Sequence, residues 1–233
     1  MTGRFALDLS ASSSTLLNER SFPLSCDSMS IVSLPNQASE ERGLEILGSI
    51  RQAFAEKGFD GASMQDLARA AGMSVGNFYR YFPSKAAIVQ AMCTYDLAEI
   101  QSEFAEIKLS DAPMVCLRER MLMHFGEEGM HDGQLWAEIT AAAMRKPEIG
   151  AASLQMEETI TRLLASIFAG VTRRPEPEAL LRYQGQCQLL VMLVKAMAIR
   201  TALSGPANPA LGAQVVAVID RILNDISNDT ARG

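Results

Sequence analysis

The sequence predicts an all-α fold of about nine helices, and three observations support this prediction. Alanine, leucine and methionine are plentiful, whereas aromatic residues make up only 6% of the chain, a composition that favours helices over sheets. No run of alternating β-branched residues is long enough to indicate a strand. Segments containing proline and glycine divide the chain at intervals typical of helices. With 48% hydrophobic residues, the chain can bury a sizeable core.

The N-terminal segment and the first helix differ sharply in pattern. Residues 1–38 are rich in serine, asparagine and threonine and show no helical periodicity, so we expect a flexible extension there. The first helix is predicted from Ser39 to about Lys57, because its apolar residues repeat on one face. Gly58 then supplies a stop signal.

Two short helices are expected next. In "SMQDLARAAG", Ser63 can cap the helix N-terminus together with Asp66 three residues later, and Gly72 ends the helix. The following helix spans about 74–82, and Pro83 prevents its continuation. Two short helices joined by a tight turn are typical of a helix-turn-helix.

Six further helices are expected in the rest of the chain. They are separated by segments that contain proline or glycine. The predicted ranges are 84–108, about 112–126, 132–144, 147–169, 176–203 and 208–227.

Charge is distributed unevenly in this chain, whose formal net charge is −6. Residues 39–85 hold six basic and six acidic residues, whereas residues 86–233 hold thirteen basic and eighteen acidic ones. No carboxylate occurs between Asp66 and Asp96, an interval that contains three basic residues. We therefore expect only this end of the molecule to approach a polyanion such as DNA.

The helix predicted at 74–82 carries the candidate DNA-contacting side chains. Its periodicity places Val75, Phe78 and Phe82 on the inner side. The outer side and its border carry polar and aromatic residues, namely Asn77, Tyr79, Arg80 and Tyr81. In a helix-turn-helix, the second helix lies in the major groove with its N-terminal residues at the base edges.

The residue types at this helix suit such contacts. Gly76 permits close approach, Asn77 can pair with adenine edges, and the Val75 methyl groups can contact a thymine methyl. The two tyrosine hydroxyls and Lys85 suit phosphate oxygens, which fix the register of a protein on DNA. For the inward phenylalanines we expect only a core role.

The chain resembles the N-terminal DNA-binding domain of the TetR family of transcriptional regulators over "ILGSIRQAFAEKGFDGASMQDLARAAGMSVGNFYRYFPSKAAIVQAM", residues 46–92. The usual run of that family is close to G-x-S-x-G-x-L-Y-x-Y-F-x-x-K-x-x-L. Matching residues here are Gly72, Ser74, Gly76, Tyr79, Tyr81, Phe82 and Lys85. Phe78 and Ile88 stand where leucine is usual, and neither change threatens the fold.

The resemblance implies a homodimer that binds a palindromic operator in double-stranded DNA and commonly represses transcription. It also implies that a small-molecule effector binds the C-terminal part and moves the two DNA-binding domains of the dimer apart. The positions that match base contacts are Gln65, Val75, Gly76, Asn77 and Arg80. Arg80 could contact either a base or the DNA backbone. The positions that match backbone contacts are Ser63, Ser74, Tyr79, Tyr81 and Lys85.

Three parts are therefore expected. They are a flexible extension over 1–38, a helix-turn-helix DNA-binding domain over 39–85, and a helical ligand-binding and dimerisation domain over 86–233. An alternative is a DNA-tethered interaction protein of the same fold, without effector-controlled transcription. A second alternative, a helical sensor or enzyme that has lost DNA binding, is disfavoured by the intact tyrosines and lysine of the motif.

The last two predicted helices are candidates for a dimer interface or for core within one subunit. Apolar residues nearly surround the segment 189–199 and form a wide stripe on the final helix. The resemblance favours a four-helix bundle formed with a second subunit. The candidate interface residues are Leu189, Met192, Leu193, Ala196, Val215, Val218, Ile219 and Ile222.

A candidate ligand pocket lies around the only tryptophan of the chain. Methionine side chains adapt to varied shapes, although such residues at helical spacing also form ordinary core. The candidate pocket residues are Met121, His124, Phe125, Trp136 and Met144. The spacing of His124, Glu128 and His131 would suit zinc on a continuous helix. We expect Gly126 and Gly129 to break that helix, so no metal or other cofactor is predicted.

Several classes of function are disfavoured. No glycine-rich phosphate loop, G-x-S-x-G or convincing catalytic pair occurs, so we do not expect an enzyme. The four cysteines are scattered, which indicates reduced thiols. No signal peptide is recognisable, and the apolar stretch 189–199 contains Lys195 and is too short for a membrane span. A cytoplasmic protein without a membrane partner is predicted.

Overall fold

The structure, a computed structural model, describes residues 37–125, 127–205 and 208–229. Within these ranges it contains nine helices and no strand, which confirms the predicted fold class. The helices are α1 (Gln37–Lys57), α2 (Met64–Ala70), α3 (Val75–Tyr81), α4 (Lys85–Leu109), α5 (Pro113–Met123), α6 (Glu127–Ala143), α7 (Pro147–Thr172), α8 (Glu176–Ser204) and α9 (Pro209–Asp229).

Helix boundaries differ from the prediction by up to five residues, and the starts of α1 and α6 differ in ways that matter for the interpretation. α1 begins at Gln37, so the last two residues of the expected extension are helical, and the rest of it lies outside the described residues. α6 begins at Glu127, and the expected break at Gly129 was wrong. A single glycine inside a helix costs only about 1 kcal/mol, which tertiary packing offsets. The chain turns instead at His124 and Phe125.

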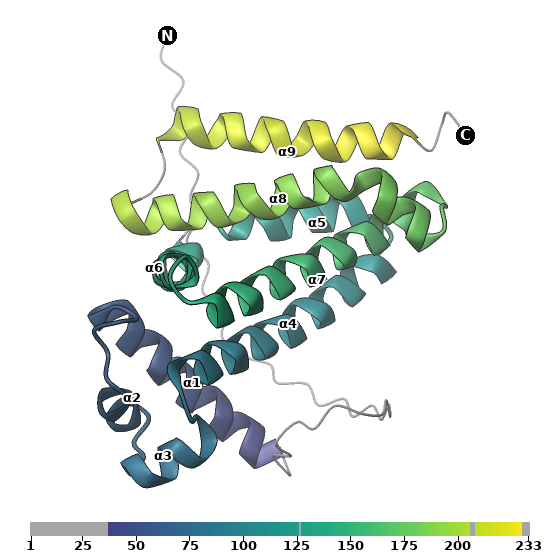
Figure 1. Cartoon of the computed structure of the whole chain (residues 1–233). Helices are drawn as coiled ribbons and strands as arrows, with labels where there is room; N and C mark the ends of the chain where they lie inside the picture. Colours follow the sequence, from purple (N-terminus) through teal and green to yellow (C-terminus); the bar gives the residue numbers. More distant parts are fainter. Residues whose placement is uncertain (1–36, 126, 206–207, 230–233) are drawn as a thin grey trace.

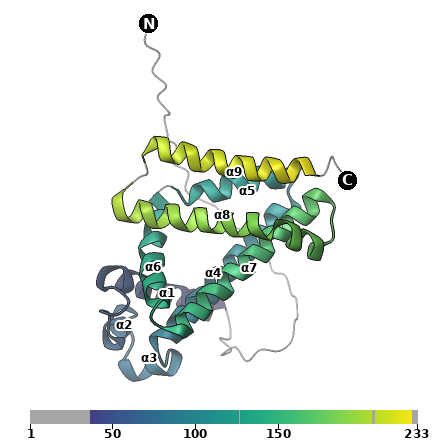
Figure 2. The same ribbon diagram turned by 45° about the horizontal axis from the view of Figure 1, so that its top comes forward.

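The helices form a small unit and a larger body, as Figure 1 shows. α1, α2 and α3 lie together at one end, and α4 leads from this unit into the body alongside α7. α8 and α9 run side by side across the opposite end. In the turned view α6 extends from the small unit to α8 (Figure 2). Thus α4 and α6 both connect the small unit to the body.

The core of the small unit continues into the body. Phe54 and Phe78 have no exposed surface, and Ile88 of α4 is equally buried beside them. The same cluster of buried side chains includes Leu135 and Ile139 of α6. Because this apolar surface is shared, movement of α6 relative to α1 would disturb the packing of both parts.

α6 and α8 approach one another unusually closely at Gly133. A Cβ atom at this position would lie 2.1 Å from the carbonyl oxygen of Ala198. Any residue other than glycine would therefore force the two helices apart. This contact fixes α6 against the long helix α8.

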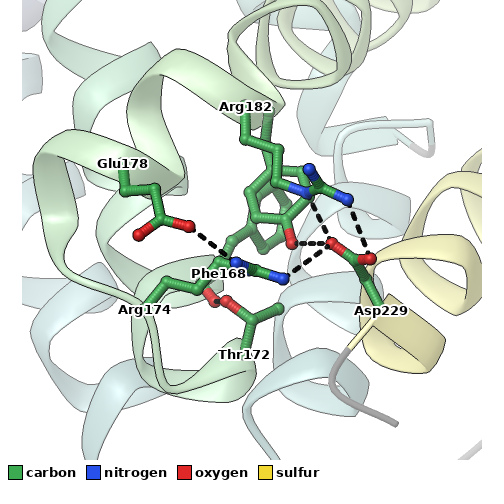
Figure 3. A network of polar contacts seen from close by, with 7 residues as sticks. Phe168, Thr172, Arg174, Glu178, Arg182 and Asp229 are labelled. Carbon is green, nitrogen blue, oxygen red and sulfur yellow. Dashed lines mark hydrogen bonds and ion pairs between the residues drawn. The ribbon is translucent and has the colours of Figure 1, made fainter. Parts of the chain in front are cut away.

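The C-terminus of α9 is held by the polar network shown in Figure 3. Arg182 donates from Nε to Oδ2 of Asp229 at 2.6 Å and from Nη2 to Oδ1 at 2.9 Å. The Tyr183 hydroxyl donates to Oδ2 of the same carboxylate at 2.6 Å. Hydrogen bonds from Arg182 and Tyr183 lower the pKa of Asp229 from 3.8 to about 2. These contacts join α9 to α8 within one subunit.

Candidate nucleic-acid interface and internal cavity

The start of α2 is fixed by the predicted N-cap. The Ser63 Oγ accepts a hydrogen bond from the Asp66 backbone N–H at 3.1 Å, and the Asp66 carboxylate accepts one from the Ser63 N–H at 3.0 Å. Lys57, at the end of α1, contacts the other carboxylate oxygen at 2.6 Å. Lys57 and Ser63 hold the pKa of Asp66 far below its usual value. One carboxylate thus orients α2 relative to α1.

The turn between α2 and α3 depends on Gly72, whose φ is +63°. This left-handed conformation is favourable only for glycine and a few other residues. The Met73 N–H donates to the Ala68 carbonyl at 2.9 Å, and Ser74 then caps α3 by accepting from the Asn77 backbone N–H. The turn therefore sets the direction in which α3 leaves the unit.

α3 buries one side and presents the other to solvent. Phe78 is completely buried and packs against Phe82, with ring centroids 5.3 Å apart. The predicted base- and phosphate-contacting residues of α2 and α3 are all exposed, namely Ser63, Gln65, Ser74, Val75, Gly76, Asn77, Tyr79, Arg80 and Tyr81. The prediction that Val75 packs inwards was wrong. It is 39% exposed because the first turn of α3 lies at the edge of the core.

We call the exposed residues 75–77 and 79–81 the α3 face. Tyr79 and Tyr81 are 47% and 46% exposed, which is unusual for large aromatic side chains. Within the described residues their hydroxyl groups and the Arg80 guanidinium make no hydrogen bond or ion pair. These donors are therefore free to bind an external partner.

Lys85 lies differently from its predicted place in a phosphate contact. Its Nζ donates to the carbonyl oxygens of Phe59 at 2.7 Å and Asp60 at 3.1 Å, and it lies 5.4 Å from the Phe59 ring centroid. Burial lowers the pKa of this ammonium group. Lys85 thus stabilises the loop after α1 within the subunit, and a phosphate contact stays a prediction.

The same loop is held by the body. The Phe59 N–H donates to Oε2 of Glu138 on α6 at 2.8 Å. Arg145 binds the Asp60 carboxylate at 2.6 Å, and Lys146 lies 3.6 Å from it. The hydrogen bond from Arg145 lowers the pKa of Asp60, an effect that its desolvation opposes. α6 and the loop between α6 and α7 therefore contact the small unit through polar groups as well as through the shared core.

A cavity of about 510 Å³ lies in the body and reaches the small unit. Such a volume suits a small organic molecule. Its walls come from α4, α5, α6, α7 and α8, and also from Leu47, Gly48 and Arg51 of α1. A molecule in the cavity would therefore contact a helix that supports α3.

The predicted pocket residues are only partly brought together. Met121, His124 and Trp136 line the cavity. Phe125 packs instead against a separate core cluster of the body that includes Leu117 and Phe168. Met144 is 86% exposed just after the end of α6. Sequence reasoning missed the walls from α1, α4, α7 and α8, because their residues read as ordinary amphipathic or core-facing helix sides. The side chains of Glu128 and His131 lie outside those described. The described histidine, cysteine, aspartate and glutamate side chains form no cluster of three that could hold a metal ion.

Three ion pairs surround the cavity, each between neighbouring helices. Arg51 of α1 binds Asp96 of α4. Lys195 of α8 binds Glu157 of α7 at 2.7 Å, and its Nζ also lies 5.6 Å from the Trp136 ring centroid. The third pair joins α4 to α5, where Arg120 Nε donates to Oε2 of Glu103 at 2.7 Å. Charged groups thus interrupt an otherwise mainly apolar lining.

The outer side of α8 and α9 is apolar and exposed. Of the predicted interface residues, Leu189, Met192, Ala196 and Val218 are exposed, and Leu193 and Val215 are half-buried. Ile219 and Ile222 belong instead to the core of the subunit, because they face α5 and α7. By length and composition alone α8 could cross a membrane, and 28% of its most apolar window is buried within the subunit.

Two of the three cysteines that the structure describes have poorly reactive thiols. Cys93 and Cys187 are buried, and burial raises their pKa values to about 11 and about 12. Both groups therefore remain protonated near neutral pH. Free, reduced cysteines at these positions agree with the sequence-based interpretation.

Comparison with known proteins identifies relatives of this chain. The family model for bacterial regulatory proteins of the TetR family matches residues 46–92. The HTH-type transcriptional regulator UidR of Escherichia coli (strain K12) is 30% identical over 131 residues, which are 56% of this chain and 66% of UidR. The match thus spans slightly less than two thirds of that relative. The HTH-type transcriptional regulator BetI of Cronobacter sakazakii is 24% identical over 172 residues, 70% of this chain and 81% of BetI.

Solved structures share the fold. Salmonella enterica GusR has a TM-score of 0.63 at 22% identity, covering 83% of this chain and 98% of its own. A TetR-family regulator from Mesorhizobium loti has a TM-score of 0.61 at 23% identity, covering 82% and 97%. FadR from Bacillus subtilis in complex with stearoyl-CoA has a TM-score of 0.58 at 16% identity, covering 80% and 98%. At these identities the likeness concerns the fold alone.

Proposed function

Because this chain belongs to the TetR family of bacterial regulatory proteins, we propose that it is a cytoplasmic transcriptional repressor that is not an enzyme. It binds a palindromic operator as a homodimer, and a small molecule that enters the cavity releases it from DNA. The α3 face carries this proposal, since its amide, guanidinium and phenol groups are exposed and have no partner among the described residues.

Base reading is assigned to the N-terminal part of α3. Gly76 and Asn77 lie in its first turn, where a recognition helix meets base edges. Gln65 of α2 and Arg80 are the further base-contacting candidates. Ser63, Ser74, Tyr79 and Tyr81 surround this tip and are assigned to phosphate oxygens. This division follows from which groups can read a base edge and which can only bind the backbone.

Dimerisation through α8 and α9 is supported by their exposed apolar side. Met192 is 63% exposed and Leu189 is 41% exposed, and Leu181 and Leu203 extend the same side of α8. An apolar surface of this kind costs free energy in water and is typical of an interface. A two-fold axis there would present two α3 helices to half-sites about 34 Å apart, one turn of duplex.

Effector control is supported by the position of the cavity. α1 forms part of its wall, and α6 carries both Trp136 into the lining and Glu138 to the Phe59 N–H. A bound molecule that shifts either helix would change how the DNA-binding unit sits on the body. This arrangement favours the effector-controlled repressor over a DNA-tethered interaction protein. FadR, of similar fold, holds stearoyl-CoA.

Fluorescence anisotropy with labelled duplexes from the region beside the gene tests DNA binding. We expect one duplex to bind specifically, with an affinity that falls steeply as salt rises. The Tyr81→Ala protein should bind every duplex more weakly. A folded, dimeric wild-type protein that binds none of the duplexes, or whose affinity does not depend on salt, would contradict the proposal.

A further inference from the structure

We propose that the cavity takes an organic cation with an apolar body, and that Glu99 at its opening binds the positive charge. The proposal rests on the proposed function only in that the cavity is a ligand site. It concerns the chemical class of the ligand. This class follows from which charged side chains of the lining already form ion pairs with one another and which do not.

The body of such a ligand would meet a mainly apolar wall. Side chains from six helices contribute to it, and they include Ile100, Leu117, Met156 and Val194. Binding there removes apolar surface from water, which favours ligands with hydrocarbon or aromatic groups. The walls therefore favour a ligand with an apolar body, but they do not determine the charge of that ligand.

The arginine and lysine side chains of the lining are already occupied. Arg51, Arg120 and Lys195 are each bound to a carboxylate on a neighbouring helix. An anionic ligand would have to displace one of those carboxylates and leave it without its cation. Such an exchange is costly in a partly buried site. The lining therefore offers no ready partner for an anion among these three groups.

Glu99 differs from the other three carboxylates of the lining. Within the part of the chain that the structure describes, no cation lies within ion-pair distance of it. Its Oε1 accepts a hydrogen bond from the Tyr95 hydroxyl at 3.2 Å. Glu99 is exposed and also lines the cavity, so it lies where the cavity opens to solvent. A cation entering there would meet a carboxylate that needs no internal rearrangement.

Aromatic side chains add to this preference. Tyr95 lies beside Glu99 and Trp136 lies in the same lining, and aromatic rings attract organic cations through their negative faces. Burial raises the pKa of the Tyr95 hydroxyl, and the negative charge of Glu99 raises it further. The phenol therefore stays protonated and keeps donating to Glu99. The four carboxylates outnumber the three arginine and lysine side chains of the lining, so the permanent charges there also favour cations.

Two probes of matched shape and opposite charge test the proposal. Tetraphenylphosphonium and tetraphenylborate are each titrated into the full-length protein in the same buffer. The fluorescence of Trp136, the single tryptophan, reports occupancy of the cavity. We expect the phosphonium to bind at least about five-fold more tightly than the borate, because a cation contacts an available carboxylate and aromatic rings.

The variant Glu99→Gln keeps the size of the side chain and removes its charge. We expect it to weaken phosphonium binding by about five-fold and to leave borate binding unchanged or stronger. Glu106→Gln is the matched control, since Glu106 is exposed on the same helix and does not line the cavity. Equal affinities for the two probes, binding of neither, or phosphonium binding that Glu99→Gln does not change would each overturn the proposal.

DNA binding is measured separately on the same samples. If the phosphonium binds the wild type tightly but does not alter DNA affinity, the ligand class stands and effector-controlled release fails. If the phosphonium releases DNA from the wild type, and less readily from Glu99→Gln, both the cationic ligand class and effector-controlled release stand. Borate-selective binding that releases DNA would leave the repressor function intact and overturn the cationic ligand.

Discussion

The α3 face and the cavity lining both carry charged and aromatic side chains, but the subunit uses them differently. On the α3 face the Arg80 guanidinium and the hydroxyls of Tyr79 and Tyr81 have no polar partner among the described residues. In the cavity the two arginines and the lysine of the lining are all bound to carboxylates. The first surface can bind a polyanion without rearrangement, whereas the second disfavours anions. The two sites should therefore respond oppositely to the charge of a ligand.

The largest effect should come from the buried side of α3. Replacing Phe78 by alanine removes a completely buried ring that packs on Phe82. We expect the free energy of unfolding to fall by about 3–5 kcal/mol, measured by denaturant titration. Tyr79→Ala, on the exposed side of the same helix, is the control and should change it by less than about 1 kcal/mol. Similar losses from both variants would remove the distinction between the two sides of α3.

The α3 face can be divided further by its effect on DNA. Asn77→Ala should reduce discrimination at one base pair by about 1–3 kcal/mol. Tyr81→Ala should weaken binding to all sequences alike, because it removes a backbone contact. Affinities for the operator and for single-base variants distinguish these outcomes. If Asn77→Ala weakened every sequence equally, its base-reading role would be wrong.

Lys85 belongs to neither surface in the structure, although the family motif assigns it to DNA. Lys85→Met keeps the length of the side chain and removes two hydrogen bonds to loop carbonyls. We expect the free energy of unfolding to fall by about 1–2 kcal/mol. The slope of log affinity against log salt should stay unchanged. A slope reduced by about one would instead show that Lys85 binds a phosphate.

The smallest effect concerns acid stability at the end of α9. The pKa of Asp229 is lowered to about 2 by its hydrogen bonds, so the folded state is stabilised by the ionised form. This contribution is present above the unfolded value of 3.8 and is lost as the pH falls towards about 2. Asp229→Asn should lower the melting temperature at neutral pH, with a difference that shrinks in acid.

Asp225→Asn provides the control for this pH dependence. Asp225 is exposed on the same helix and forms no ion pair with any other residue that the structure describes. Its replacement should leave the melting temperature nearly unchanged across the same range. If Asp229→Asn destabilised the protein equally at every pH, the ionised carboxylate would not be the source of the stabilisation.

The N-terminal unit could be predicted closely because its signals are local. Ser63 with Asp66 forms the expected capping box, Gly72 has the expected left-handed backbone, and Phe78 is buried as its periodicity indicates. Caps and turns involve residues a few positions apart, so their sequence pattern specifies their geometry. The nine helices of the described residues were all expected for the same reason.

The cavity could be predicted only in part, because its walls come from six helices. Trp136 was an obvious candidate, but nothing local to Arg51 or Glu99 indicates that either would line a cavity with it. Ile219 and Ile222 show the same limit, since an apolar stripe on a helix does not reveal which side meets the subunit's own core. Lys85 likewise binds carbonyl groups of a loop some 25 residues away, a contact that nothing local to it indicates.

Selection of bound duplexes from a pool of random sequence tests the central claim most directly. If two α3 helices of a dimer read successive major grooves, the wild type should enrich a palindrome whose half-sites are centred about 10 base pairs, or a multiple of one turn, apart. Asn77→Ala should enrich the same palindrome with relaxed preference at one symmetric position. Enrichment of no sequence, or of a single site without two-fold symmetry, would contradict the account.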